Sequence, residues 1–240
     1  NKVCLITGSA IRVGKSIAQT LASEGARVVI HYRSQAKEAQ NTADQIIRNG
    51  GKAIIVKGDI SKQEDWITMR NIIIEKWKSI DVLINNAAIF FKTPFFNTTE
   101  GDFDKFLNIN LKGVFLGCQV IGKIMYQNKS GKIINITDVS AESVWPDYIP
   151  YCISKAGVTA LTKGLAKSLA PYVTVNAISP GTVLLAEEYD EMEENRLIER
   201  TPLKRVGSPQ DIANTAKFII QGSDFITGTI INVDGGRSLT

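Results

Sequence analysis

Histidine and cysteine, the side chains that bind zinc most often, are scarce in this sequence of 240 residues. It has one histidine, His31, and three cysteines that are scattered along the chain without a Cys-X-X-Cys pair. We therefore expect neither a zinc site nor another bound metal. A sparse and odd number of cysteines also argues against a disulfide-bonded scaffold and is typical of a reducing compartment.

Long apolar runs are lacking as well, and none reaches the roughly 20 residues that span a membrane. No signal peptide is recognisable, so we expect a cytoplasmic protein without membrane contact. The net charge is only +4, and no cluster of Lys and Arg indicates a nucleic-acid partner. The composition, with 44% apolar and 22% charged residues, is that of a globular protein.

The sequence does contain a regular alternation of apolar segments and helical patterns. The expected strands cover residues 3–7, 27–31, 53–57, 81–85, 131–137, 173–177 and 229–233, and the expected helices cover 13–24, 36–48, 62–78, 102–127, 149–169 and 209–221. Strands that are apolar throughout are buried on both faces. Repeated strand–helix–strand units predict an α/β fold: one doubly wound parallel sheet with helices on both faces, in a single domain over residues 1–240.

Ligands of such sheets bind beyond the carboxyl ends of the strands. A glycine-containing loop follows the first expected strand, and it includes Gly8, Arg12, Val13 and Gly14. Gly8 permits a tight turn, Gly14 allows close packing of the next helix, and the helix N-terminus offers free N–H groups to a phosphate. Glycines that serve only the turn and the packing would give the same pattern.

The segment after the second expected strand indicates which nucleotide binds. NAD-binding sheets usually place an acidic residue here for the ribose 2′-hydroxyl, and this sequence has Arg33 and Ser34 instead. Arg33 can pair with a 2′-phosphate, Ser34 can donate a hydrogen bond to it, and Arg12 adds a second positive charge. The pattern predicts NADPH, although two solvated loop arginines are the alternative.

Small and polar residues follow the later strands too. Asp59 can accept a hydrogen bond from adenine or cap the next helix. Asn86 and Ala87 let the backbone approach a cofactor, or form a simple Asx turn. The remaining predicted cofactor contacts are Ile60, Pro180 and Gly181. An irregular acidic stretch, Glu187 to Glu194, follows the sixth strand, and we predict a substrate lid around residues 182–205, with a solvated charged helix as the alternative.

A candidate proton donor lies in the expected helix 149–169. Tyr151 and Lys155 are four residues apart, so they share one face of a helix. An ammonium beside a phenol stabilises the phenolate, and we therefore expect a lowered pKa of Tyr151.

Together these motifs resemble the short-chain dehydrogenase/reductase family over essentially the whole chain. The resemblance implies a Rossmann-type sheet of seven strands, a nicotinamide cofactor and a homotetramer. It also implies that Lys155 binds the nicotinamide ribose and that Asn110 holds a water in the proton path. The motifs that carry it are Thr7 to Gly14, Asn85-Asn86-Ala87, Asn110, Tyr151 to Lys155, Pro180-Gly181 and Asp234-Gly235-Gly236.

Two departures from the common family pattern resemble the pteridine reductase branch. Arg12 stands where most members have glycine, and Asp138 stands 13 residues before Tyr151, where most have a catalytic serine. Ser140 is near but out of register for that role. The branch also has a phenylalanine after its Asn-Ala turn, which Phe90 matches here, whereas Phe91 replaces an expected tyrosine.

The resemblance implies an NADPH-dependent pteridine reductase that transfers hydride to a C=N bond of a pterin or dihydrofolate. Phe90 would stack on the pterin, and Asp138 and Tyr151 would relay a proton to a ring nitrogen. A carboxyl group can accept from ring N–H groups and, when protonated, can donate. A 3-oxoacyl-[acyl-carrier-protein] or other ketone reductase, and a catalytically silent NADP-binding regulator, are the alternatives. Asp138 as a simple cap and Phe90 as a core aromatic stay open as well.

Overall fold

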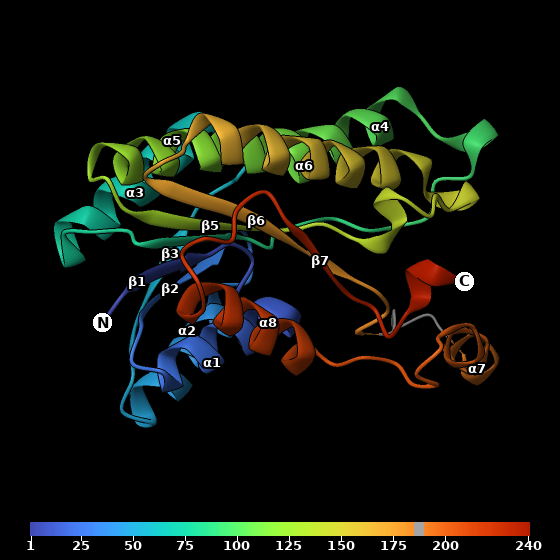
Figure 1. Ribbon diagram of the computed structural model, residues 1–240, viewed down its shortest axis with the longest axis horizontal. Coiled ribbons are helices and arrows are strands. Elements are labelled where there is room, and N and C mark those ends of the chain that lie inside the picture. Colours follow the sequence, from blue (N-terminus) through green and yellow to red (C-terminus); the bar gives the residue numbers. More distant parts are fainter. Residues whose placement is uncertain (185–189) are drawn as a thin grey trace.

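A single parallel sheet organises the chain, which is described by a computed structural model for residues 1–184 and 190–240. In this described part the sheet has seven strands in the order β3-β2-β1-β4-β5-β6-β7 (Figure 1). Every neighbouring pair is parallel, which confirms the predicted doubly wound α/β sheet. The strands are β1 (Val3–Ile6), β2 (Arg27–Tyr32), β3 (Lys52–Lys57), β4 (Val82–Asn85), β5 (Gly131–Ile136), β6 (Val173–Pro180) and β7 (Ile230–Val233).

Helices cover both faces of the sheet, as predicted. In Figure 1, α1, α2 and α8 lie below the sheet, and α3, α5 and α6 lie above it. The α-helices of the described residues are α1 (Arg12–Ser23), α2 (Ala36–Arg48), α3 (Gln63–Trp77), α4 (Glu100–Phe106), α5 (Gly113–Gln127), α6 (Ile149–Ser168), α7 (Glu191–Arg200) and α8 (Pro209–Gln221). None of them is long and apolar enough to cross a membrane.

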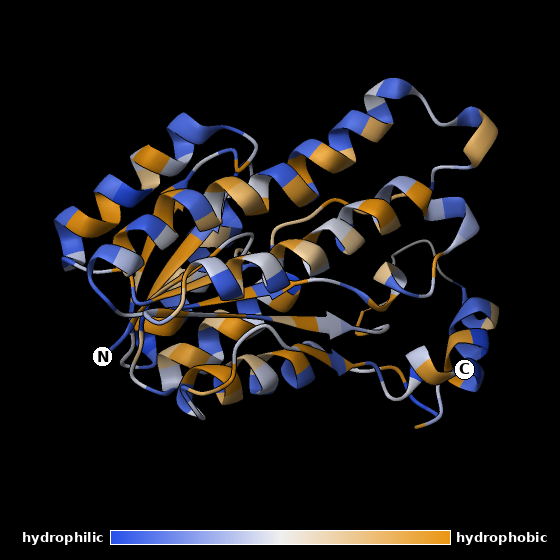
Figure 2. Cartoon of the chain, turned by 45° about the horizontal axis from the view of Figure 1, so that its top comes forward, coloured by the Kyte–Doolittle hydropathy of each residue, from blue (hydrophilic) through white to orange (hydrophobic). Residues whose placement is uncertain are grey.

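Alternate residues of each strand fill two separate apolar cores. In β1, Cys4 and Ile6 contact the core under α1, α2 and α8, whereas Val3 and Leu5 contact the core under α3, α5 and α6. Figure 2 shows hydrophobic residues gathered on the strands, between helices of mixed hydropathy. Each fully buried aliphatic side chain contributes about 1.5–3 kcal/mol, so both faces hold the sheet in place.

Three elements differ from the sequence-based expectations. The single helix expected over 102–127 consists of α4, a π-helical segment (Leu107–Lys112) and α5. Strand β6 continues to Pro180 because its last residues pair with β7. The stretch expected to be irregular contains α7, whose N-terminus is capped by the side chain of Asp190. The expectation for Glu187 and its neighbours at 185–189 lies outside the described residues.

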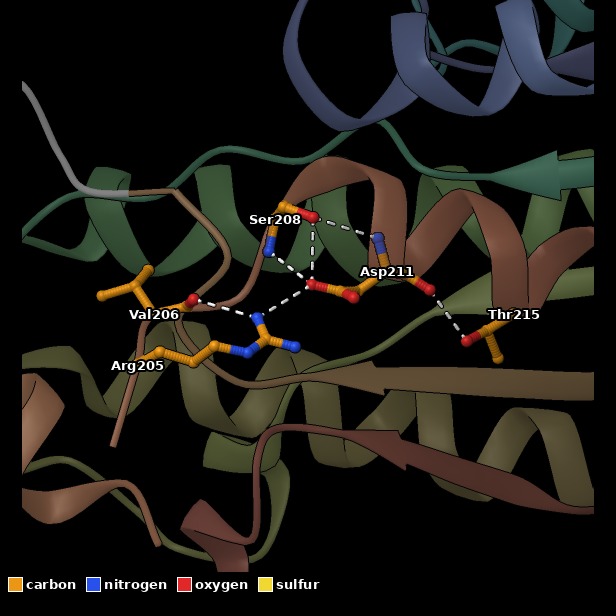
Figure 3. Close-up of polar contacts among 5 residues, drawn as sticks. All are labelled: Arg205, Val206, Ser208, Asp211 and Thr215. Carbon is orange, nitrogen blue, oxygen red and sulfur yellow. Dashed lines mark hydrogen bonds and ion pairs between the residues drawn. The ribbon is translucent and has the colours of Figure 1, made fainter. Parts of the chain in front are cut away.

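Helix α8 begins at a well-defined capping box, drawn in Figure 3. The Ser208 hydroxyl accepts from the Asp211 N–H at 3.3 Å, and Asp211 Oδ2 accepts from the Ser208 N–H at 2.8 Å. Arg205 lies 3.3 Å from the same carboxylate oxygen and also donates to the Val206 carbonyl at 3.2 Å. These contacts tie the end of the predicted lid segment to the start of α8.

Candidate active site

The loop between β1 and α1 is too crowded for side chains at its two glycines. Gly8 has φ +62°, and a Cβ atom there would lie 3.0 Å from Cα of Ala87. A Cβ atom on Gly14 would lie 2.5 Å from the Gly8 oxygen and 2.7 Å from Nδ2 of Asn86. The amide of Asn86 also donates to the carbonyl of Thr7 at 2.9 Å. The loop is therefore held close to β4, with the α1 N-terminus open to an anion.

Arg12 is the first residue of α1 and has φ +54°. This left-handed conformation favours glycine. Most members of the family that the sequence resembles have glycine at this position. Backbone outliers of this kind persist only where the surrounding structure holds them, and they cluster at ligand sites. Arg12 is exposed, so its guanidinium is available to a ligand.

A cavity of about 370 Å³ follows the carboxyl ends of β1 to β4. It brings together most of the predicted cofactor residues, from four separate segments. Tyr151, Lys155, Pro180 and Gly181 were predicted as cofactor contacts too, and they do not line this cavity. The predicted residues that do line it are Gly8, Arg12, Val13, Gly14, Arg33, Ser34, Asp59, Ile60, Asn86 and Ala87.

The lining of this cavity carries positive charge from Arg12 and Arg33. Arg33 and Ser34 are exposed, and no ion pair among the described residues includes Arg12 or Arg33. Burial alone would raise the pKa of Asp59, but hydrogen bonds from Ser61 and the charge of Arg33 outweigh it and lower that pKa. A glycine cradle, a helix N-terminus and two free arginines fit a dinucleotide with a 2′-phosphate.

Asp138, Tyr151 and Lys155 meet at the carboxyl end of β5. The Tyr151 hydroxyl donates to Asp138 Oδ2 at 2.9 Å, and the Ser140 N–H donates to Asp138 Oδ1 at 2.8 Å. Lys155 Nζ donates to the carbonyl of Ile136 at 2.9 Å and lies 5.6 Å from the centre of the Tyr151 ring. Ser140 is fully buried beside Asp138, two residues after the position of the serine that most members of the resembled family have.

The pKa of Tyr151 in this cluster shifts in the direction opposite to the expected one. We expected Lys155 to lower the pKa of Tyr151, but that pKa is raised well above 10, because the phenol is buried and faces the charge of Asp138. Burial also raises the pKa of Asp138, against the hydrogen bond from Ser140 and the charge of Lys155. The pKa of Lys155 falls to about 8 through burial, against the attraction of Asp138. Asp138 is therefore the more acidic partner of Tyr151.

Asn110 lies in the π-helical segment, a feature that is frequent at functional sites. Its Oδ1 accepts from the N–H of Ile89 at 2.9 Å, and its Nδ2 donates to the Ile89 carbonyl at 3.0 Å and to Ser154 Oγ at 3.3 Å. The side chain therefore fixes the backbone next to Phe90. The predicted water-holding role of Asn110 stays a prediction.

Phe90 lies in an aromatic group beside Tyr151. Its ring is 4.6 Å from that of Tyr148 at an interplanar angle of 3°, and 4.9 Å from that of Tyr151, edge to face. Trp145 contacts both Phe90 and Tyr148 edge to face. Phe90 is 44% exposed, so a further planar ring can stack on it beside the hydrogen-bonded pair of Tyr151 and Asp138.

Strand β6 ends at Pro180, and Gly181 follows it, at the same edge of the sheet as the carboxyl ends of the other strands. The Gly181 N–H donates to the carbonyl of Val233 at 3.1 Å, and a Cβ atom on Gly181 would lie 2.8 Å from Cα of Asp234. The predicted lid follows directly, and α7 is its largest described element. Across residues 1–184 and 190–240, no group of three or more His, Cys, Asp or Glu side chains could hold a metal ion.

Comparison with known proteins identifies the family. The family model described as enoyl-(acyl carrier protein) reductase matches residues 8–238. The chain belongs to the short-chain dehydrogenase/reductase family. This short-chain enzyme is 36% identical over 238 residues to a 3-oxoacyl-[acyl-carrier-protein] reductase of Synechocystis, with 98% of this chain and 96% of that protein covered. It is 34% identical to 3-oxoacyl-[acyl-carrier-protein] reductase FabG of Staphylococcus epidermidis, with 98% of each chain covered.

Solved structures agree with this assignment. A putative gluconate dehydrogenase from Agrobacterium tumefaciens superposes with a TM-score of 0.96 at 30% identity and covers 100% of this chain and 97% of its own. A gluconate 5-dehydrogenase from Burkholderia cenocepacia, solved with NADP and tartrate, gives a TM-score of 0.93 at 30% identity, with 100% and 96% covered. The chain is therefore a short-chain oxidoreductase with a Rossmann-like sheet.

Sequence reasoning did not identify every residue that the structure brings to the site. Trp145 and Tyr148 were not predicted as part of the aromatic group, although Tyr148 lies three residues before Tyr151. His31 had served only to argue against zinc, yet it lines the cofactor cavity. A histidine at the end of an apolar strand, two residues before Arg33, was the available signal.

Proposed function

We propose that this short-chain oxidoreductase uses NADPH to reduce a C=N bond in a pterin ring. NADPH follows from the free arginines Arg12 and Arg33 at the end of the cavity where NAD-binding sheets carry an acid. The Burkholderia relative of known structure was solved with NADP, which agrees with this choice. When bound, NADPH supplies the hydride.

The Asp138 carboxyl group carries the pterin proposal. It stands where ketone reductases of the family have a serine, and its Oδ2 lies 2.9 Å from the Tyr151 hydroxyl. A pterin presents a flat ring with N–H groups and basic ring nitrogens, which a carboxyl can bind by accepting and then by donating a proton. A ketone oxygen can only accept hydrogen bonds, so it would use the carboxyl group in its protonated form alone, whereas a pterin ring uses both forms.

Several protein groups share the orientation of the substrate and the transfer of a proton to it. Phe90 and the neighbouring aromatic rings orient a planar substrate. Asp138 holds the ring, and burial raises its pKa above the ordinary value, which favours the protonated form of the carboxyl group that can donate. The proton goes to the nitrogen of the C=N bond while the carbon receives the hydride. The Asp138 carboxylate that remains is stabilised by the hydrogen bond from Tyr151 and by the charge of the Lys155 ammonium, and it takes up its next proton from solvent.

Reduction of a 3-oxoacyl thioester is the second candidate. Two curated relatives with this name are 34–36% identical to the chain over nearly its full length, and comparisons therefore favour this substrate over a pterin. It requires a protonated Asp138 to replace the serine as the second donor to the ketone oxygen, beside Tyr151. The silent regulator is the weaker alternative, because Tyr151 and Lys155 are both present.

Parallel assays with two substrates test the proposal. We expect NADPH oxidation with a dihydropterin or dihydrofolate and little with an acetoacetyl thioester. Asp138→Asn keeps the size and loses the acid, so it should reduce pterin turnover by about a hundredfold. Its affinity for NADPH should stay unchanged, because Asp138 does not line the cofactor cavity. Turnover of the thioester alone would refute the pterin assignment and establish the second candidate.

Asp138→Ser restores the common family residue and is the matched control. We expect it to lose pterin turnover and gain activity toward the thioester. An increase in pterin turnover would contradict the role given to the carboxyl group. If neither substrate reacts with the wild type, and Tyr151→Phe leaves the phenotype of the host unchanged, the regulator gains support.

Further features of the proposal concern assembly and access. We propose one NADP-binding domain over residues 1–240, with residues 182–205 as a lid over the substrate, of which 185–189 lie outside the described residues. A homotetramer fits the exposed Phe115 on α5 and Ile153 on α6, both 44% exposed, and light scattering of the purified protein tests it. A cytoplasmic location stays a prediction.

A further inference from the structure

His31 connects two loops of the cofactor cavity through one buried side chain. It lies near the end of β2 and is 2% exposed. Its Nδ1 accepts from the N–H of Gly8 at 3.0 Å, and its Nε2 lies 3.1 Å from the carbonyl oxygen of Gly58. Gly8 follows β1 and Gly58 follows β3, and β2 lies between these strands. One imidazole thus spans the loops on either side of its own strand.

The two contacts admit only one form of the imidazole. The N–H of Gly8 can only donate and the carbonyl of Gly58 can only accept, so Nδ1 is bare and Nε2 carries the proton. A protonated ring would direct a second N–H at the N–H of Gly8. Burial lowers the pKa of His31 to about 4, against the bond to Gly58 and the charges of Asp59 and Asp65, which agrees with a neutral ring.

Both loops contact the cofactor cavity, at opposite sides of β2. Gly8 belongs to the glycine cradle in front of α1, and Gly58 precedes Asp59 and Ile60 in the loop after β3. Backbone contacts reinforce the arrangement, because the Ser9 N–H donates to the His31 carbonyl at 3.1 Å and the Gly58 N–H to the Tyr32 carbonyl at 3.1 Å. The imidazole therefore adds a direct side-chain link between two loops that backbone hydrogen bonds also attach to β2.

We propose that His31 is a positioning residue for the adenosine half of NADPH. By bridging Gly8 and Gly58, it holds the phosphate loop at a set distance from the loop that receives the adenine. It touches no reacting atom, and its effect is on binding rather than on hydride or proton transfer. The inference rests on the use of NADPH and is independent of the substrate proposed above.

Three substitutions separate the two contacts. H31N keeps an acceptor near the position of Nδ1, H31Q keeps a donor near that of Nε2, and H31F fills the space without either. Calorimetry should be run with NADPH and with two fragments, adenosine 2′,5′-bisphosphate and nicotinamide mononucleotide. We expect H31F to weaken NADPH and the bisphosphate about tenfold, H31N and H31Q to weaken them less, and the mononucleotide to stay within about twofold.

The control is Val28→Ala, because Val28 is also fully buried in β2 but lies nearer the start of the strand. It should lower the melting temperature and leave the affinities of all three ligands unchanged. Wild-type affinity for the bisphosphate in a folded H31F protein would overturn the proposal. Equal losses for both fragments, in proportion to the loss of melting temperature, would overturn it too.

A measurement on the wild type covers the case in which no variant folds. His31 is the only histidine of the chain, so the imidazole nitrogens of an untagged sample give one set of NMR signals. We expect the neutral form with its proton on Nε2 at neutral pH, and a downfield shift of one ring nitrogen or its proton on addition of the bisphosphate. The opposite tautomer, or a ring that is insensitive to the bisphosphate, would refute the bridge.

Discussion

Replacing His31 should change how stability depends on pH. The folded protein holds the imidazole at a pKa of about 4, whereas its ordinary value is 6.5. Between these values the unfolded chain binds a proton that the folded chain excludes, so the folded state loses stability as the pH falls through this window. Each pH unit corresponds to about 1.4 kcal/mol, which gives a loss of about 2 kcal/mol between pH 6.5 and pH 5.

The assay is urea unfolding of the wild type and of H31Q at several pH values in this range. Carboxyl groups elsewhere titrate in both proteins and cancel in the difference, while Asp59 and Asp65, which face the ring, are retained in both. At neutral pH the wild type should be the more stable protein, and its advantage should shrink by about 2 kcal/mol on acidification to pH 5. Parallel stability curves would refute the reasoning, because they would mean that the buried imidazole does not exclude its proton.

Three further predictions concern the cofactor and the catalytic cluster. Gly14→Ala should weaken NADPH binding at least tenfold in calorimetry, because its Cβ would lie 2.5 Å from the Gly8 oxygen; unchanged binding would contradict the cradle. Arg33→Ala should weaken NADPH about tenfold and leave NADH unchanged, and equal effects on both would argue against a 2′-phosphate site. Single-turnover rates should fall as the pH rises through about 8, because Lys155 loses its proton there; a flat profile would refute this.

The layout of the fold was readable from local patterns. Short runs of consecutive apolar residues are typical of strands that are buried on both faces. The alternation of such strands with helices leaves few possible topologies. Because parallel strands end at one edge, residues as distant as Gly8, Arg33, Asp59 and Asn86 could be assigned to one site, and they line one cavity. The break of the helix expected over 102–127 was not predictable, since its residues form good helix on both sides of the π-helical segment.

The chemistry of the site depends on contacts that the spacing of residues along the sequence does not reveal. The sequence alone determined which residue types stand after each strand: glycines, two arginines without an acid, and an aspartate in place of a serine. Only the tertiary structure decided their electrostatics. Lys155 is near Tyr151 as predicted, but burial and Asp138 dominate, and the pKa of Tyr151 rises. The bridging role of His31 was equally hidden, because a side chain acquires two partners from separate loops only when the sheet places those loops on either side of it.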